Sequence, residues 1–227
     1  MGKNGFFKGS HSWMNGESRV DFNLKLETDL YIAGDFQDIV PYTGVIQAIE
    51  DGEPVGELGR FRLTHIARYD ADMMESYDGD YLDLDEAVSS LIDDEEEEPL
   101  SLWYLDRLVV KPECRGKGIG SQTVDRLIRF ANTFSCVGSL FVVRAEPLND
   151  EGEPLALEKE GFDIKTYQVR LERLFKLFSR LGLPFLPINP PIKTFNSSEP
   201  KPLWFYYDLE KNYPPSPFIS IHSGFWN

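Results

Sequence analysis

The chain has 227 residues, 41% of them hydrophobic and 13% aromatic, which is enough for a sizeable core and excludes general disorder. The formal net charge of −15 disfavours nonspecific binding to nucleic acid. No apolar run approaches the ~20 residues of a membrane span, and two cysteines are too few for a disulfide framework. We therefore expect a cytoplasmic protein that binds neither nucleic acid nor a membrane.

The first third of the chain predicts strands. Residues 1–18 are rich in Gly, Ser and Asn and are expected to form a flexible leader. Apolar and polar residues alternate over 19–27, which is typical of a strand. Residues 44–50 and 55–67 also have extended character. Asp51-Gly52 lies between them and favours a tight hairpin turn, because Asp-Gly tolerates the positive φ angles of such turns.

The negative charge is concentrated in residues 70–98, which contain 14 acidic residues and no Lys or Arg. The rest of the chain has 23 basic and 24 acidic residues, so a near-neutral fold carries one acidic insertion. Helical spacing of apolar residues predicts a short helix over 83–93, and 93–98 predicts a solvated loop. The insertion is either a solvated excursion between strands or a region that attracts a cationic acceptor by electrostatic steering.

The rest of the chain alternates strands and helices. Periodicity and the stop signals of Gly and Pro predict strands at 101–110, 140–144 and 203–209, and helices at 120–134 and 166–181. No linker separates two independent cores. We therefore expect a single α/β domain over residues 19–210, followed by a C-terminal tail at 211–227.

The most informative stretch is Leu105–Gly120, in which a strand runs into a turn with three glycines in five residues and a helix then begins. Glycines let the backbone approach a ligand closely, and the unpaired N–H groups of a helix N-terminus bind anions. Arg115 and Lys117 add positive charge. The stretch matches neither the Walker loop nor the dinucleotide fingerprint. It predicts a pyrophosphate cradle, the alternative being a glycine-rich turn without a ligand.

The run Arg115–Gly120, with an apolar strand before it and an amphipathic helix after it, resembles the coenzyme A-binding motif [QR]-x-x-G-x-[GA] of the GNAT superfamily. The likeness covers roughly residues 101–183 and the strand at 203–209. It implies an α/β (α+β) fold with a mixed, largely antiparallel central sheet that is flanked by helices and splayed after its fourth strand. Acetyl-CoA, as co-substrate, would lie in the resulting V.

The resemblance also implies which residues hold the coenzyme. Backbone groups of the strand would pair with the pantetheine arm, and N–H groups of the loop and helix start would grip the pyrophosphate. The residues concerned are Leu108, Val109, Val110, Arg115, Gly116, Lys117, Gly118, Ile119, Gly120 and Ser121.

Acyl transfer to an amine needs a base that leaves the amine neutral. By the two-residue period of a strand, Tyr104, Asp106, Leu108 and Val110 share one face. Members of the family often use a carboxylate on this strand, so we expect Asp106 to be the base, with Tyr104 beside it. The alternative is that Asp106 pairs with a neighbouring arginine such as Arg107, or faces solvent.

The general acid departs from the family pattern. Many members place a tyrosine in the later helix as proton donor to the thiolate, and here that position holds Phe178. Tyr167, Tyr206 and Tyr207 are alternatives, among which no spacing argument selects.

The resemblance implies an N-acetyltransferase that moves an acetyl group from acetyl-CoA to a primary amine by direct attack in a ternary complex. The acceptor would be a small-molecule or peptide amine, cationic ones included. No metal is expected, because the three histidines lie far apart in sequence. The alternative is a non-catalytic protein on the same fold, which binds acyl-CoA or uses residues 70–98 as an acidic decoy for a basic partner.

Overall fold

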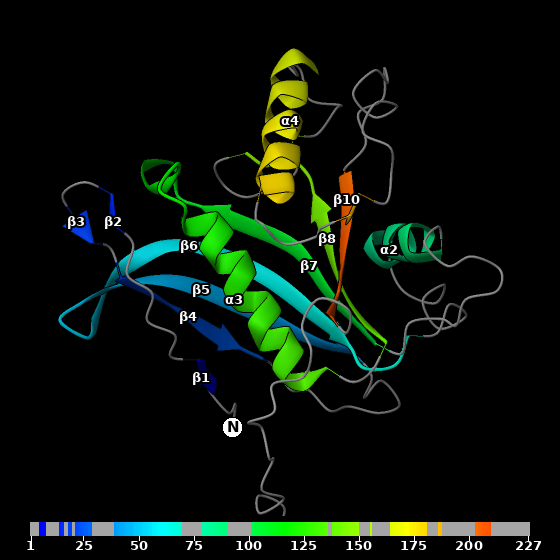
Figure 1. Ribbon diagram of the computed structural model, residues 1–227, viewed down its shortest axis with the longest axis horizontal. Helices are drawn as coiled ribbons and strands as arrows, with labels where there is room; N and C mark the ends of the chain where they lie inside the picture. The colour runs from blue at the N-terminus through cyan, green and yellow to red at the C-terminus, as the bar shows by residue number, and fades with distance from the viewer. Residues whose placement is uncertain are drawn as a thin grey trace, which may run out of the picture.

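The computed structural model describes residues 5–7, 14–15, 18–19, 21–28, 39–69, 79–89, 101–135, 138–149, 155, 164–180, 186–187 and 203–209. Its main feature is an eight-stranded sheet with the strand order β1-β4-β5-β6-β7-β8-β10-β9 (Figure 1). The edge strand β9 is the short Leu186–Pro187. Every neighbouring pair is antiparallel except β7 and β8, which are parallel. A separate two-stranded ribbon joins β2 (Met14–Asn15) to β3 (Ser18–Arg19).

The antiparallel half of the sheet consists of β1 (Gly5–Phe7), β4 (Asp21–Glu27), β5 (Ile39–Glu50), β6 (Glu53–Ile66) and β7 (Ser101–Val110). The expected hairpin is confirmed, and both turn residues have positive φ: 51° at Asp51 and 87° at Gly52. The strand β1 lies within residues 1–18, the expected leader, and it pairs with β4. Three residues are too few to show a period, and the domain boundaries stay a prediction.

The strand β5 begins five residues before the expected position and contains Pro41, which a central strand normally excludes. Pairing with β4 ends at Thr43, so Pro41 lies where β5 pairs with β6 alone. The missing N–H of the proline therefore breaks no ladder with β4.

The sheet splays between β7 and β8 (Ser139–Ala145). These strands pair from Ser101 and Ser139 up to Leu105 and Val143, and no further. Beyond that point β7 continues along β6 to Val110, while β8 continues along β10 (Leu203–Asp208). The mixed, largely antiparallel sheet that splays after the fourth predicted strand is therefore confirmed.

Helices cover both faces of the sheet. Figure 1 shows α3 (Ile119–Phe134) and α4 (Ile164–Arg180) in front of it. Both pack into one core cluster, which includes fully buried residues of α3 at helical spacing: Val124, Leu127, Ile128 and Ala131. In the described parts of the chain, no helix has both the length and the hydropathy to cross a membrane.

The opposite face carries α2 (Gly79–Ser89), which contributes Leu84, Ala87 and Val88 to a second core cluster. The predicted helix at 83–93 is thus present but begins four residues earlier. Its three core residues lie within the predicted range, whose last part, 90–93, is outside the described residues. The flanks of the acidic insertion, 70–78 and 90–98, lie outside the described residues.

Candidate functional site

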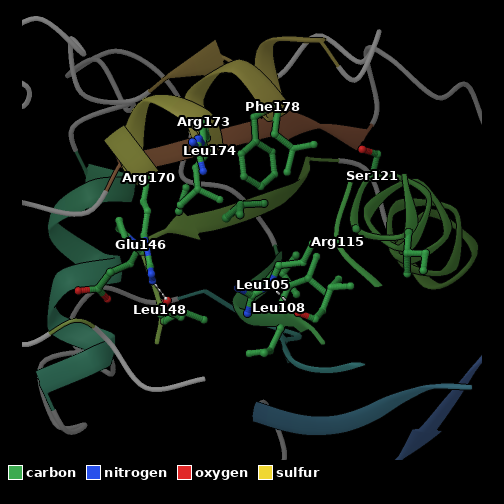
Figure 2. A pocket seen from close by; sticks show the side chains of 18 of the residues that line it. Leu105, Leu108, Arg115, Ser121, Glu146, Leu148, Arg170, Arg173, Leu174 and Phe178 are labelled. Atoms are coloured by element: carbon green, nitrogen blue, oxygen red, sulfur yellow. Dashed lines mark hydrogen bonds between the residues drawn. The ribbon is translucent and has the colours of Figure 1, made fainter. Parts of the chain in front are cut away.

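A cleft of about 670 Å³ opens where β7 and β8 separate (Figure 2). One wall is the second half of β7 with the loop and the first turn of α3. The other wall is the end of β8, the segment up to Asn149, and α4. Of the expected coenzyme residues only Lys117, which is exposed, does not line it. Those that do are Leu108, Val109, Val110, Arg115, Gly116, Gly118, Ile119, Gly120 and Ser121.

The loop before α3 depends on glycine. Gly116 has a φ of 76° and Gly118 a φ of 75°, a region that residues with a side chain rarely adopt. Gly118 is the N-cap of α3, it offers no side-chain cap, and the first turn contains no acidic residue. The first α3 amide bonded within the helix is that of Gln122, 3.1 Å from the Gly118 carbonyl oxygen. The preceding N–H groups are therefore suited to an anion.

The charge of the cleft is opposite to that of the protein. Four arginines and two carboxylates line it, a balance of +2 in a chain of −15. Arg115 is held at the mouth by its Nε, which donates to the Val110 carbonyl oxygen at 2.9 Å. Across the cleft, Nη1 of Arg170 donates to the Leu148 carbonyl oxygen, also at 2.9 Å. This excess of positive charge fits a polyanionic ligand.

Sequence reasoning missed Arg170 and Arg173, which line the cleft from α4. Their three-residue spacing on a predicted helix places them on one face. The sequence contains no signal for what that face meets, because the position of α4 against β8 and β10 is a tertiary property.

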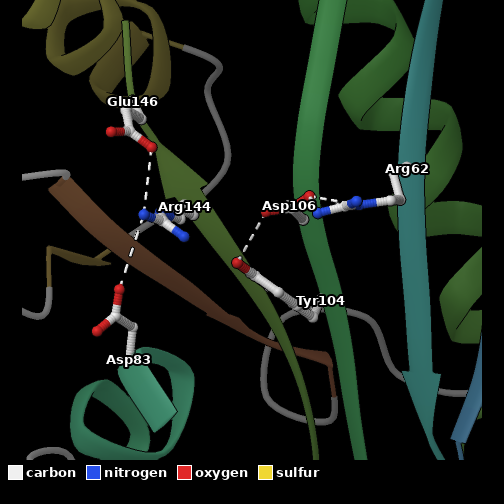
Figure 3. Close-up of polar contacts among 6 residues, drawn as sticks. All are labelled: Arg62, Asp83, Tyr104, Asp106, Arg144 and Glu146. Atoms are coloured by element: carbon white, nitrogen blue, oxygen red, sulfur yellow. Dashed lines mark hydrogen bonds and ion pairs between the residues drawn. The ribbon is translucent and has the colours of Figure 1, made fainter. Parts of the chain in front are cut away.

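Asp106 lies at a β-bulge in β7. Arg107 is opposite Arg62 on β6 and Leu105 is opposite Leu63, so Asp106 is the extra residue between them. Its side chain is 7% exposed and forms an ion pair with Arg62 (Figure 3). The alternative expectation, that Asp106 pairs with a neighbouring arginine, is met by Arg62, which comes from the adjacent strand β6.

The bulge also overturns the expectation that Tyr104 shares a face with Leu108 and Val110. Tyr104 packs in the core cluster under α2, whereas Leu108 and Val110 pack against the cluster of α3 and α4. An inserted residue inverts the alternation of a strand, and the two-residue period therefore fails across Asp106.

Tyr104 reaches Asp106 from the α2 side. Its hydroxyl donates to Oδ1 of Asp106 at 3.1 Å, and the tyrosine is 2% exposed. Burial raises the pKa of Tyr104, and the negative charge of Asp106 raises it further, while Arg144 opposes this. The phenol therefore remains a protonated hydrogen-bond donor. Tyr104 itself is not among the residues that line the cleft.

A second ion-pair group lies where β8 ends. Nη2 of Arg144 is 3.3 Å from Oε2 of Glu146 and 3.7 Å from Oδ2 of Asp83 on α2 (Figure 3). The side chains of Arg144 and Glu146 are 14% and 16% exposed, and both line the cleft. Nothing in the sequence indicated that Arg144 bridges β8 to the acidic insertion.

The position at which the family pattern has a tyrosine, as proton donor to the thiolate, holds a phenylalanine here. Phe178 lines the cleft and stacks on Phe205 with ring centroids 5.0 Å apart. Tyr167 and Tyr207 are buried in the core cluster of α3 and α4, and burial raises the pKa of Tyr167. In the described part of the chain, the residues lining the cleft include no tyrosine. Nor do the described residues contain a group of His, Cys, Asp and Glu that could hold a metal ion.

We compared the sequence and the structure with known protein families and solved structures. The model of the acetyltransferase (GNAT) family matches residues 11–162. Among solved structures, the chain is similar to the histone acetyltransferase HPA2 and related acetyltransferase from Corynebacterium glutamicum, at 16% identity and a TM-score of 0.35. That similarity covers 78% of this chain and 65% of the other, slightly less than two thirds of its length.

Two further structures are similar at comparable distance. Arabidopsis thaliana NAA60 in complex with acetyl-CoA has 17% identity and a TM-score of 0.37, over 75% of this chain and 76% of that one. The loading GNATL domain of CurA from Lyngbya majuscula has 12% identity and a TM-score of 0.38, over 74% and 77%. No curated protein matches the chain. With the family match spanning well over half of its residues, the chain belongs to the GNAT acetyltransferase family.

Proposed function

We propose that this protein transfers an acetyl group from acetyl-CoA to a primary amine by direct attack in a ternary complex. The observation that carries the proposal is the cleft between β7 and β8, which has a glycine-rich anion site on one wall and a buried carboxylate, Asp106, near its base. The balance of +2 inside a chain of −15 supports a ligand with several negative charges.

Acetyl-CoA would bind along β7. The N–H groups at the start of α3 and the guanidinium of Arg115 would hold the pyrophosphate. Beyond Leu105, β7 has no pairing with β8, so its backbone is available on that edge for the amides of the pantetheine arm. This places the thioester toward the base of the V, near Asp106.

Asp106 would act as the base. The ammonium of the acceptor gives one proton to Asp106, and the neutral nitrogen attacks the thioester carbonyl carbon. The C–N bond forms, the C–S bond breaks, and the nitrogen loses its second proton as the leaving thiolate gains one. Tyr104 would position the carboxylate through its hydroxyl, because its raised pKa keeps that hydroxyl protonated.

The acceptor would enter from the α2 side, where Tyr104 and Asp83 lie. Asp83 belongs to the acidic insertion, and that insertion has no basic residue. This supports a cationic small molecule or peptide as acceptor, although the proposal requires only a primary amine.

Calorimetric titration with acetyl-CoA tests the coenzyme site. We expect the wild type to bind with a Kd on the order of micromolar, and Gly118→Trp to abolish binding by filling the anion site. Gly52→Trp is the matched control, because Gly52 also has a positive φ but lies in the β5–β6 turn with nothing within 4 Å. Its variant carries the same backbone strain and should bind normally. Equal loss in both variants, or binding in neither wild type nor variant, contradicts the proposal.

A second candidate is a protein that binds acyl-CoA without catalysis. It is favoured by Phe178 at the cleft, where the family often has a tyrosine, and by the engagement of Asp106 with Arg62. Release of free thiol from acetyl-CoA should be followed with a panel of polyamines, aminoglycosides and lysine-containing peptides. Tight coenzyme binding with no amine-dependent thiol release across that panel would favour this candidate over the enzyme.

A further inference from the structure

We infer that Arg170 and Arg173 of α4 bind the 3′-phosphate of coenzyme A and make the cleft select the complete coenzyme over forms without that phosphate. The inference rests on the proposed coenzyme site and adds a second anion subsite to it, on the wall opposite the glycine loop. Figure 2 shows both arginines on the α4 side of the pocket, across from Ser121.

The two arginines are neighbours on the wall of the cleft. They are three residues apart on α4, hence neighbours on one helical face, and both line the cleft. Arg170 is fixed by its bond to the Leu148 carbonyl oxygen at 2.9 Å. Among the described residues, no carboxylate pairs with either guanidinium. The acid between them in sequence, Glu172, instead lies 3.9 Å from Lys176.

Two like charges on one helical face repel each other, and an anion between them removes that cost. Arginine is well suited to this role, because its planar guanidinium matches a phosphate with two parallel hydrogen bonds. A phosphate monoester that enters the cleft would therefore find two guanidinium groups on this wall, one of them, Arg170, already held in place.

The chemistry of coenzyme A supplies such a group. The molecule carries a pyrophosphate and, separately, a phosphate on the 3′ oxygen of its ribose. The start of α3 and Arg115 account for the pyrophosphate on the β7 wall, which leaves the α4 wall for the second anion.

The test compares coenzyme A with dephospho-coenzyme A, which lacks only the 3′-phosphate, by calorimetric titration. In the wild type we expect coenzyme A to bind about tenfold more tightly or better, as befits charge-assisted hydrogen bonds. In the double variant Arg170→Gln with Arg173→Gln, that preference should fall to about twofold or less, while affinity for dephospho-coenzyme A is retained. Lys176→Gln removes one positive charge from the same helix outside the cleft and should keep the preference.

Three results would overturn the inference or its basis, and they are distinguishable. Equal binding of both ligands by the wild type refutes the 3′-phosphate subsite alone. Equal weakening of both ligands by the double variant means that the arginines act on the shared pyrophosphate, which also refutes it. Binding of neither ligand by the wild type refutes the proposed function. If thermal unfolding shows that the double variant is misfolded, Arg173→Gln replaces it, and half or more of the preference should then be lost.

Discussion

Replacement of Asp106 by asparagine tests the proposed base with little change in shape. The amide can still accept the bond from the Tyr104 hydroxyl, now 3.1 Å from Oδ1, but it cannot take a proton from the acceptor amine. General base catalysis contributes about 10²- to 10⁴-fold, so kcat/KM should fall by that factor. The Kd for acetyl-CoA should change by about twofold or less, because the carboxylate contributes no donor to the phosphates.

The same change has a structural cost that can be worked from the burial of the pair. The side chain of Asp106 is 7% exposed, whereas that of Arg62 is 43% exposed. Water at the arginine side reduces the penalty below that of a fully buried pair, and we expect a loss of about 1–3 kcal/mol. For a chain of this size that corresponds to a fall in Tm of about 2–4 °C per kcal/mol.

The assay follows thiol release from acetyl-CoA with an accepted amine, together with thermal unfolding. Arg60→Gln is the control, since Arg60 lies on β6, the strand of Arg62, is exposed, pairs with Glu57 and does not line the cleft. It should leave both rate and stability close to wild type. Normal turnover by Asp106→Asn would refute the assignment of the base. A rate loss that disappears once the variant is stabilised by cooling would show that Asp106 acts only in folding.

Two further predictions concern the strands that carry the site. Gly59→Ala should lower the free energy of unfolding by about 1–3 kcal/mol in urea denaturation, because its Cβ would lie 2.2 Å from the Val109 carbonyl oxygen, whereas Gly56→Ala meets nothing within 4 Å and should be neutral. Similar effects of both alanines would contradict the packing argument. Burial lowers the pKa of His65 from 6.5 to about 4, and its ring stacks on Trp103 with centroids 4.0 Å apart. The folded state resists protonation of His65, whereas the unfolded chain takes up the proton near pH 6.5. The neutral imidazole therefore contributes fully to the free energy of unfolding above pH 6.5, and this contribution is lost as the pH falls toward 4. The partial burial limits the loss to about 2 kcal/mol or less. The variant His65→Phe should lose that part of the pH dependence of unfolding, and an unchanged slope between pH 6.5 and 4 would contradict it.

The central unit of the fold was predictable because its signals are local. Apolar periodicity indicated β7, β8 and α3. On α3 it selected four residues that the core buries, Val124, Leu127, Ile128 and Ala131, but it also selected Phe134, which is 60% exposed. Glycines with positive φ and the bare N-terminus of α3 follow from residue types at short spacing. Of the residues predicted to hold the coenzyme, Lys117 is the one that does not line the cleft, and their role in binding stays a prediction.

The parts of the site that sequence reasoning missed depend on contacts between distant segments. Arg62 pairs with Asp106 from 44 positions earlier in the chain, and Arg144 meets Asp83 of the acidic insertion. The spacing of Arg170 and Arg173 predicts that they share one helical face, but it does not predict that this face lines a cleft. Contacts between residues so far apart in sequence depend on which strands and helices pack together, and no local sequence pattern encodes that packing.

One residue illustrates the division between the two levels. The sequence by itself determined that a carboxylate lies on the strand that runs into the glycine-rich loop. Only the tertiary structure decided that Asp106 is the extra residue of a bulge, with Tyr104 and Leu108 on opposite faces around it. The physical reason is that a bulge arises from the register between two strands, and register is set by how β6 and β7 pair along their length.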